Sequence, residues 1–73
     1  MEELDARGLR CPLPVLKARK RLKALEQGAQ LRVLADDPAA VIDVPHFCNE
    51  QGHTLEDQGQ DGDALTFVIR KGC

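Results

Sequence analysis

The placement of the prolines most constrains how this chain can fold. Pro12 and Pro38 each follow a short polar segment, in Arg10-Cys11-Pro12-Leu13-Pro14 and in Asp36-Asp37-Pro38. Proline favours the first position of a helix, and the residue before a proline is held in extended geometry. We therefore predict that Cys11 and Asp37 are the N-caps of two helices, with Pro12 and Pro38 at the first helical positions.

Hydrophobic spacing predicts how far these helices extend. The first helix is expected from Pro12 to about Glu26, with Gly28 just beyond its end. Its apolar face, at spacings of three and four, is formed by Val15, Ala18, Leu22 and Leu25. The second helix is expected from Pro38 to about Gln51 and should end at Gly52. Because a proline ring clashes with the preceding turn, we expect Pro45 to kink or restart it.

Four short segments predict strands around these helices, namely Glu3–Ala6, Leu31–Ala35, His53–Gln58 and Ala64–Lys71. The glycine- and aspartate-rich residues 59–63 predict a hairpin turn between the last two. The element order is then βαβαββ. Two helices in so short a chain cannot shield both faces of a sheet, so we expect an α/β (α+β) two-layer sandwich with both helices on one face.

Size and composition restrict the class of protein. The chain has 73 residues, which predicts a single domain over 1–73 that is too small for a deep substrate cavity. No apolar run approaches the roughly 20 residues that span a bilayer, and the N-terminus is acidic where a signal peptide would be basic, so we expect a soluble cytoplasmic protein with no membrane partner. Three cysteines without C-x-x-C spacing argue against a disulfide framework and a zinc site.

The predicted helix start makes Cys11 the leading candidate for chemistry. Unpaired amides and the helix dipole stabilise an anion at an N-terminus, and a neighbouring cation such as Arg10 acts in the same direction. Pro12 and Pro14 carry no N–H, which stiffens the turn and leaves the amides of Leu13 and then Val15. These features predict a lowered pKa and a reactive thiolate. The alternative is a small buried cysteine without a chemical role.

The charges are unevenly distributed along the chain. Six cations and no acid lie between Arg10 and Leu25, namely Arg10, Lys17, Arg19, Lys20, Arg21 and Lys23. Such a face is either simply solvated or a docking surface for an acidic protein or for RNA.

Four segments in order resemble the TusA (SirA-like) sulfur-carrier family. They are Leu4-Asp5-Ala6-Arg7-Gly8-Leu9-Arg10-Cys11-Pro12-Leu13-Pro14, Ala35-Asp36-Asp37-Pro38-Ala39, Asp43-Val44-Pro45-His46-Phe47-Cys48 and Ile69-Arg70-Lys71-Gly72. The resemblance covers nearly the whole chain. It implies a mixed four-stranded sheet with two helices. It also implies a carrier protein with sulfurtransferase activity, which accepts sulfane sulfur as a persulfide on Cys11.

The resemblance also implies partners and site residues. The sulfur donor would be a cysteine desulfurase or a rhodanese-type protein, and the acceptor another protein. The product would be tRNA 2-thiouridine, or the sulfur would enter sulfur oxidation or molybdenum-cofactor synthesis. No cofactor beyond the covalent persulfide, no metal and no DNA are expected. Arg10, Pro12, Leu13 and Pro14 would support the sulfur, and Arg19, Lys20, Lys23 and Asp37 are possible partner contacts, although Asp37 could be only a helix cap.

Several residues leave alternatives open. Leu13 replaces an acidic residue common in the family, which should make the surroundings of Cys11 less negative, or could mark a different partner. Cys48 is expected to be a core thiol, with a redox role as the alternative. Cys73 could be a second sulfur station, a resolving thiol or an incidental exposed cysteine. The other classes of function are an RNA- or protein-binding module that uses the basic helix, and a thiol redox enzyme that would depend on Cys73.

Overall fold

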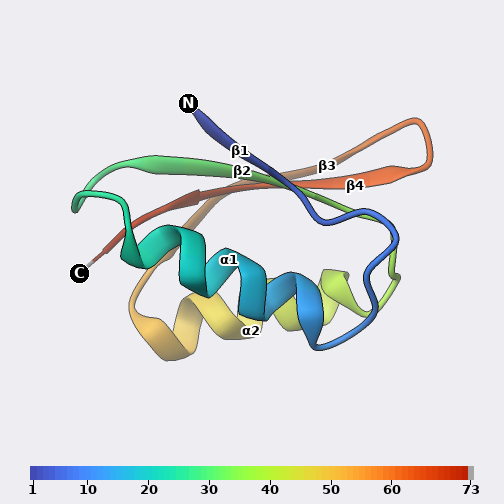
Figure 1. The fold of residues 1–73 in the computed structure, drawn as a ribbon, viewed down its shortest axis with the longest axis horizontal. Coiled ribbons are helices and arrows are strands. Elements are labelled where there is room, and N and C mark those ends of the chain that lie inside the picture. Colours follow the sequence, from blue (N-terminus) through green and yellow to red (C-terminus); the bar gives the residue numbers. More distant parts are fainter. Residues whose placement is uncertain (73) are drawn as a thin grey trace.

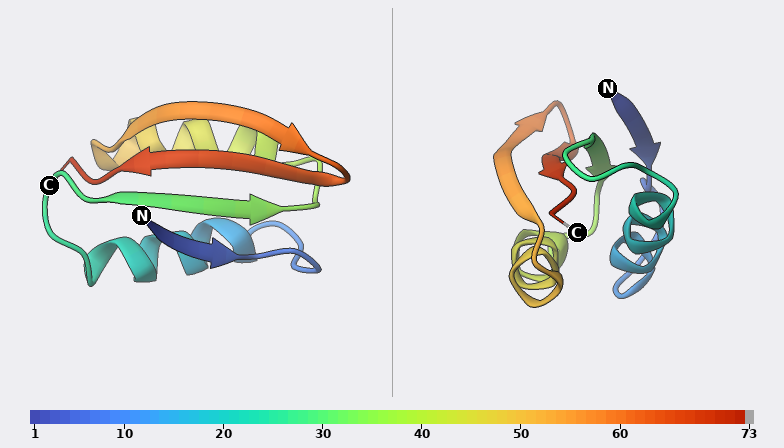
Figure 2. Two further views of the ribbon diagram at one scale, coloured as in Figure 1. Left: turned by 90° about the horizontal axis from the view of Figure 1, so that it is seen from above. Right: turned by 90° about the vertical axis from the view of Figure 1, so that its left-hand side faces the viewer.

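The computed structural model describes residues 1–72. The elements in chain order are β1 (Glu2–Asp5), α1 (Leu13–Lys23), β2 (Gln30–Ala35), α2 (Ala40–Gln51), β3 (Thr54–Asp61) and β4 (Ala64–Arg70). Both helices lie on one face of a four-stranded mixed sheet, which gives two layers (Figures 1 and 2). The predicted α+β sandwich and its element order are confirmed.

The sheet has the order β1-β2-β4-β3. β1 runs parallel to β2, whereas β4 is antiparallel to both of its neighbours. The parallel pair matters for the site, because each of its strands is followed by a helix. Both helices therefore begin at the same end of the molecule (Figure 1).

The core lies between the sheet and the helices. Alternate residues of β2, Leu31, Val33 and Ala35, are fully buried, and Val33 and Leu31 pair with Phe67 and Ile69 of β4. Strand alternation directs these side chains to the same face. Burial of this face against the two helices is the main force that fixes how the helices sit.

α1 presents one apolar face to the core, as its spacing predicts. Ala18 and Leu22 are buried, and Val15 and Leu25 pack against the core from its margin. The helix ends at Lys23, three residues earlier than expected. The reason is a tightened last turn, in which the Ala24 and Leu25 amides donate to carbonyls three residues back.

α2 begins two residues later than predicted and does not restart at Pro45. The cap position is Ala39, and the helix is continuous from Ala40 to Gln51 with Pro45 inside it. Proline costs one backbone bond there. Val44, Phe47 and Cys48 flank Pro45 and are buried, so packing compensates for that loss.

In the hairpin between β3 and β4, the paired part of β3 is longer and the turn is shorter than predicted. Asp61 pairs with Ala64, so only Gly62 and Asp63 form the turn. Gly62 has a φ of 61°, which glycine adopts without strain. The expected five-residue turn is wrong because Gly59 belongs to β3 and pairs with Thr66.

Candidate functional site

Cys11 lies in the loop between β1 and α1, one residue before the N-cap. Pro12 occupies the cap position and α1 begins at Leu13, so the prediction that Cys11 is the N-cap is wrong by one residue. The cause is a backbone bond of 2.8 Å from the Leu13 N–H to the Arg10 carbonyl, which closes a turn ahead of the helix. That bond also engages the Leu13 amide that we expected to face the sulfur. The Cys11 side chain is exposed, which excludes the alternative of a buried cysteine.

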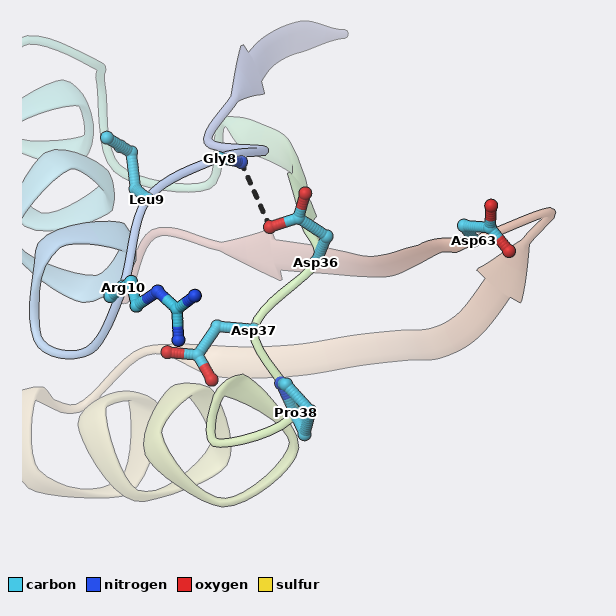
Figure 3. Close-up of a pocket in the computed structure, with 7 residues that line it drawn as sticks. All are labelled: Gly8, Leu9, Arg10, Asp36, Asp37, Pro38 and Asp63. Carbon is cyan, nitrogen blue, oxygen red and sulfur yellow. Dashed lines mark hydrogen bonds between the residues drawn. The ribbon is translucent and has the colours of Figure 1, made fainter.

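Two consecutive aspartates tie this loop to the segment that precedes α2. Asp36 Oδ1 accepts a bond of 2.9 Å from the Gly8 N–H, drawn as a dashed line in Figure 3. Asp37 Oδ2 accepts a bond of 2.7 Å from the Cys11 N–H, and its Oδ1 accepts one of 3.1 Å from the Ala39 N–H. These amides lower the pKa of Asp37. Asp37 is thus not the N-cap of α2; it fixes the backbone of Cys11.

The electrostatics around the sulfur oppose the sequence-based prediction. The pKa of the Cys11 thiol is raised, chiefly through the carboxylate of Asp43 in the first turn of α2. Some loss of water around the sulfur, and the negative charges of Asp43 and Asp37, act in the same direction. The expected lowered pKa is therefore wrong. Leu13 stands where many members of the family have an acidic residue. In this chain Asp43, on the other helix, provides a negative charge near Cys11 instead.

Cys11 opens into a groove of about 470 Å³ between α1 and α2. The groove is lined by Cys11, Pro12, Val15, Asp43, His46, Phe47, Glu50 and Gln51. Aliphatic side chains are exposed on the same two helices, with Leu13 and Leu16 on α1 and Val41 and Ile42 on α2. Ile42 is the most exposed of these, at 75%. Exposed aliphatic side chains of this kind are typical of surfaces that contact other proteins.

Arg10 belongs to a different recess from the sulfur. A polar hollow of about 410 Å³ is lined by Gly8, Leu9, Arg10, Asp36, Asp37, Pro38 and Asp63 (Figure 3). In that view the Arg10 guanidinium lies beside Asp37, and its charge helps to lower the pKa of Asp37. Arg10 therefore acts on the aspartate that holds Cys11. Pro14, also predicted to support the sulfur, is buried in α1.

The cations of α1 divide into a structural one and exposed ones. Arg21 pairs with Glu2 at 2.7 Å and donates to the Glu3 carbonyl at 3.3 Å, so it secures β1 at the edge of the sheet. Three of the four predicted contact residues, Arg19, Lys20 and Lys23, are exposed and line one shallow surface depression with Leu16. The structure thus brings these three together on one face of α1, whereas Asp37 lies in the loop before α2.

The remaining cysteines differ in their surroundings. Cys48 is 2% exposed, and burial raises its pKa to about 11, as expected of a core thiol. Cys73 lies outside the described residues. Within residues 1–72 there is no group of three or more His, Cys, Asp or Glu side chains placed to hold a metal ion. Over the same residues no helix has the length and apolar character needed to cross a bilayer.

Comparison with known proteins places this fold and site. The crystal structure of a SirA-like protein from Desulfitobacterium hafniense superposes on this chain with a TM-score of 0.84 at 28% identity, and the match covers 100% of both chains. The fold is therefore that of the SirA-like two-layer domains.

Sequence comparison defines the family more closely. The family model described as Sulfurtransferase TusA matches residues 2–71. The chain is also 43% identical over 70 residues to a protein named sulfur carrier protein TusA from Allochromatium vinosum, across 96% of this chain and 92% of that protein. The chain belongs to the TusA family of sulfur carriers.

One residue of the site was missed by the sequence analysis. Asp43 lies in a segment that carries the family resemblance, but nothing in the chain order relates it to Cys11. The available signal was topological: a parallel pair of β1 and β2 sends both helices the same way, so their first turns lie side by side.

Proposed function

We propose that this protein carries sulfane sulfur as a persulfide on Cys11 and transfers it to an acceptor protein in the cytoplasm. The donor is a cysteine desulfurase or a rhodanese-type protein. The route we favour ends in tRNA 2-thiouridine, with sulfur oxidation and molybdenum-cofactor synthesis as related routes. The observation that carries the proposal is an exposed Cys11, with its backbone fixed by Asp37, in a chain of the TusA family.

The transfer is a thiol exchange in which every atom is accounted for. Cys11 loses its proton to solvent, and the Sγ thiolate attacks the terminal sulfur of the donor persulfide. A bond forms between Sγ and that sulfur, the S–S bond of the donor breaks, and the donor cysteine leaves as a thiolate. Delivery repeats the exchange with the acceptor thiolate as the attacking group. The carried persulfide is the only group that this chemistry requires on the carrier.

The position of Cys11 suits this exchange. Attack on divalent sulfur needs an in-line approach, so the sulfur must be reachable by large partners. Cys11 is exposed in a loop, whereas Cys48 is enclosed by the core. The exposed Arg19, Lys20 and Lys23 on the adjoining helix are the side chains that we assign to the acidic face of a partner.

Intact and peptide mass spectrometry tests the proposal. The protein is incubated with a cysteine desulfurase and cysteine, and in parallel with a rhodanese and thiosulfate. We expect the added mass of sulfur on the peptide that contains Cys11. Cys11→Ser should abolish it and Cys73→Ser should retain it. No added sulfur with either donor, or sulfur that survives Cys11→Ser, would refute the proposal.

The exposed cations also favour a second candidate, an RNA-binding module in which Arg19, Lys20 and Lys23 contact phosphates. Binding of RNA would then weaken steeply as salt is raised and would survive Cys11→Ala. A filter-binding titration with tRNA at two salt concentrations separates this candidate from the carrier, for which we expect no specific RNA binding.

A further inference from the structure

The space between the two helices extends beyond the groove that contains Cys11. A second depression, of about 180 Å³, lies between the later turns of the helices and the segment after β4. It is lined by Arg19, Leu22, Lys23, Gln51, His53 and Lys71. Gln51 lines the Cys11 groove as well, so the two hollows adjoin and form one interhelical furrow along α1 and α2.

The two ends of this interhelical furrow have opposite charge. Asp43 and Glu50 line the end that contains Cys11, and none of the described residues there is a lysine or an arginine. Arg19 and Lys23 of α1 line the far end, where no described residue is an aspartate or a glutamate. The furrow is thus acidic beside the sulfur and basic where the helices end.

These charges have few partners within the molecule. No ion pair is seen for Asp43, Arg19 or Lys23 within residues 1–72. Glu50 Oε1 lies 3.6 Å from His46 Nε2, and that pair has two charges only when the histidine is protonated. Complementary charges on a bound segment would therefore meet furrow charges that are not already neutralised.

Exposed aliphatic side chains flank the furrow at its sulfur end. Ile42 is one turn from His46 on α2, and the Leu16 N–H donates to the Pro12 carbonyl at 3.1 Å, so both aliphatic residues adjoin residues that line the groove. Ile42 is 75% exposed and Leu16 is 48% exposed. A segment that lies in the furrow can cover both, which adds apolar burial to the charge pairing.

We propose that this furrow seats a segment of the protein that exchanges sulfur with Cys11, and that the segment has a basic side chain beside its reactive cysteine and an acidic side chain toward the ends of the helices. The proposal rests on the proposed function for the reaction at Cys11 and adds the chemistry of the partner. The charges orient the segment as well as attract it, because the reversed order would place like charges together at both ends.

The length of the helices sets the length of the segment. α1 has 11 residues, which span roughly 16 Å. An extended chain covers that distance with about five residues. The basic and the acidic side chain of the partner are therefore separated by about five extended residues.

Thiol exchange with synthetic peptides tests this assignment without a sulfur donor. One peptide has lysines next to its cysteine and glutamates about five residues away, and the second has the same composition with lysines and glutamates exchanged. Both are made in either chain direction and activated as mixed disulfides with 5-thio-2-nitrobenzoate. The Cys11 thiolate attacks the peptide sulfur, a disulfide forms between them, and thionitrobenzoate leaves as a thiolate. Mass spectrometry counts the product on Cys11 alone.

The measured quantity is the ratio of the rates of the two peptides. It is divided by the same ratio for 2-mercaptoethanol, so that the intrinsic reactivities of the peptides cancel, and the reactivity of Cys11 cancels within each variant. We expect the peptide with lysine beside its cysteine to react about fivefold faster at low salt in at least one chain direction. The ratio should approach one as salt is raised.

Two double variants with unchanged net charge locate the effect. Asp43→Asn combined with Lys23→Gln neutralises one residue at each end of the furrow and should reduce the ratio to about half. Asp57→Asn combined with Arg32→Gln makes the same changes on the sheet and should retain the wild-type ratio. Circular dichroism shows that each variant is folded.

A ratio near one in both chain directions, a preference for the reversed peptide, or an equal fall in the control variant would overturn the proposal. Analytical ultracentrifugation of the free protein is run in parallel. A stable dimer that protects Cys11 from both peptides would make a second copy the occupant and would also overturn it. Sulfur loading is measured separately, so failure of the carrier function and failure of this proposal are distinguishable.

Discussion

At the scale of single residues, Asp37 joins two parts of the chain that are distant in sequence. One carboxylate oxygen accepts the Cys11 amide and the other accepts the Ala39 amide at the start of α2. The carboxylate therefore holds the reactive loop against the second helix. Charge-assisted bonds of this kind are stronger than neutral ones, and the bond from the Gly8 N–H to Asp36 holds the same loop in the same way.

Asp37→Ala should loosen the loop without removing the thiol. The Cys11 amide loses its acceptor, and its hydrogen exchange should accelerate by roughly tenfold. Thermal unfolding should occur at a lower temperature. Asp61→Ala, which removes an exposed carboxylate from β3, should change neither measurement. Unchanged exchange at Cys11 in Asp37→Ala would contradict the assigned role.

The contribution of Asp37 should also depend on pH. Its pKa is lower in the folded chain than the ordinary value of 3.8, because the two amides stabilise the carboxylate. A depressed pKa contributes stability above the unfolded value, and this contribution is lost as the pH falls through the folded one. The difference in urea midpoint between the wild type and Asp37→Ala should therefore be full at pH 6 and shrink below pH 4. A difference that grows on acidification would have the wrong sign.

At the scale of elements, α1 has two faces with separate tasks. Leu22 is 1% exposed and packs in the core, whereas Leu16 is 48% exposed on the side that carries Arg19, Lys20 and Lys23. One face fixes the helix to the sheet, and the other is available to a partner. The sulfur lies at the start of this helix, so partner contacts on the outer face would be close to it.

Two substitutions on α1 should separate these faces. Leu22→Ala leaves a cavity in a small core and should cost about 2–5 kcal/mol of the free energy of unfolding. Leu16→Ala should cost less than about 1 kcal/mol, because its side chain is half exposed. Urea unfolding followed by circular dichroism measures both. Equal losses for the two variants would show that the burial pattern is wrong.

The sequence predicted the elements well because burial imposes a period on them. Ala18 and Leu22 are spaced as a helix requires, and Leu31, Val33 and Ala35 as a strand requires. The details that failed depend on contacts between distant residues. The cap position depends on the bond from Leu13 to Arg10, and the pKa of Cys11 depends on Asp43 in another helix. Neither contact can be predicted from the helix or strand propensities of the residues nearby in sequence.

At the scale of the whole molecule, the residues after β4 are bonded to the segments that follow both helices, at the end opposite Cys11. The Lys71 ammonium bonds to the Leu25 carbonyl at 2.6 Å, and the Gly72 N–H donates to His53 Nδ1 at 3.1 Å. A side chain at position 72 would meet the backbone of Gly52. The end of β4 is therefore fitted closely against the ends of both helices.

Gly72→Ala should displace the segment after β4, because the added Cβ would meet the backbone of Gly52. Burial, and to a lesser extent the charge of Lys71, lowers the pKa of His53 below 6.5. Once the segment moves away, the pKa of His53 should rise toward 6.5, and the unfolding temperature should fall. An NMR titration of the histidine ring protons measures the shift, with His46 as the internal reference. An unchanged His53 titration would contradict the described packing.

The cations of the two layers differ in whether an ion pair is seen for them among the described residues. Arg19 and Lys23 lie on the helical layer, whereas Arg32 and Arg70 lie on the sheet and are paired with Glu3 and Glu56. Unpaired cations steer acidic partners more effectively than paired ones.

Neutralising the helical cations should slow sulfur loading by a protein donor. We expect Arg19→Gln combined with Lys23→Gln to reduce the loading rate by about tenfold at low salt, and the effect should weaken as salt is raised. Arg32→Gln combined with Arg70→Gln makes the same change in net charge on the sheet and should have little effect. Equal slowing by both pairs would mean that net charge, and not the α1 surface, guides the donor.

The central claim is that Cys11 accepts sulfur and passes it on, and a loading-and-chase measurement by peptide mass spectrometry tests it most directly. The wild type is loaded by a cysteine desulfurase with cysteine, separated from the donor, and mixed with an acceptor protein that has a reactive thiol. The account predicts one added sulfur on the Cys11 peptide, which disappears from the carrier as it appears on the acceptor. Sulfur found on Cys48 or Cys73 instead, or a Cys11 peptide that never gains mass, would contradict it.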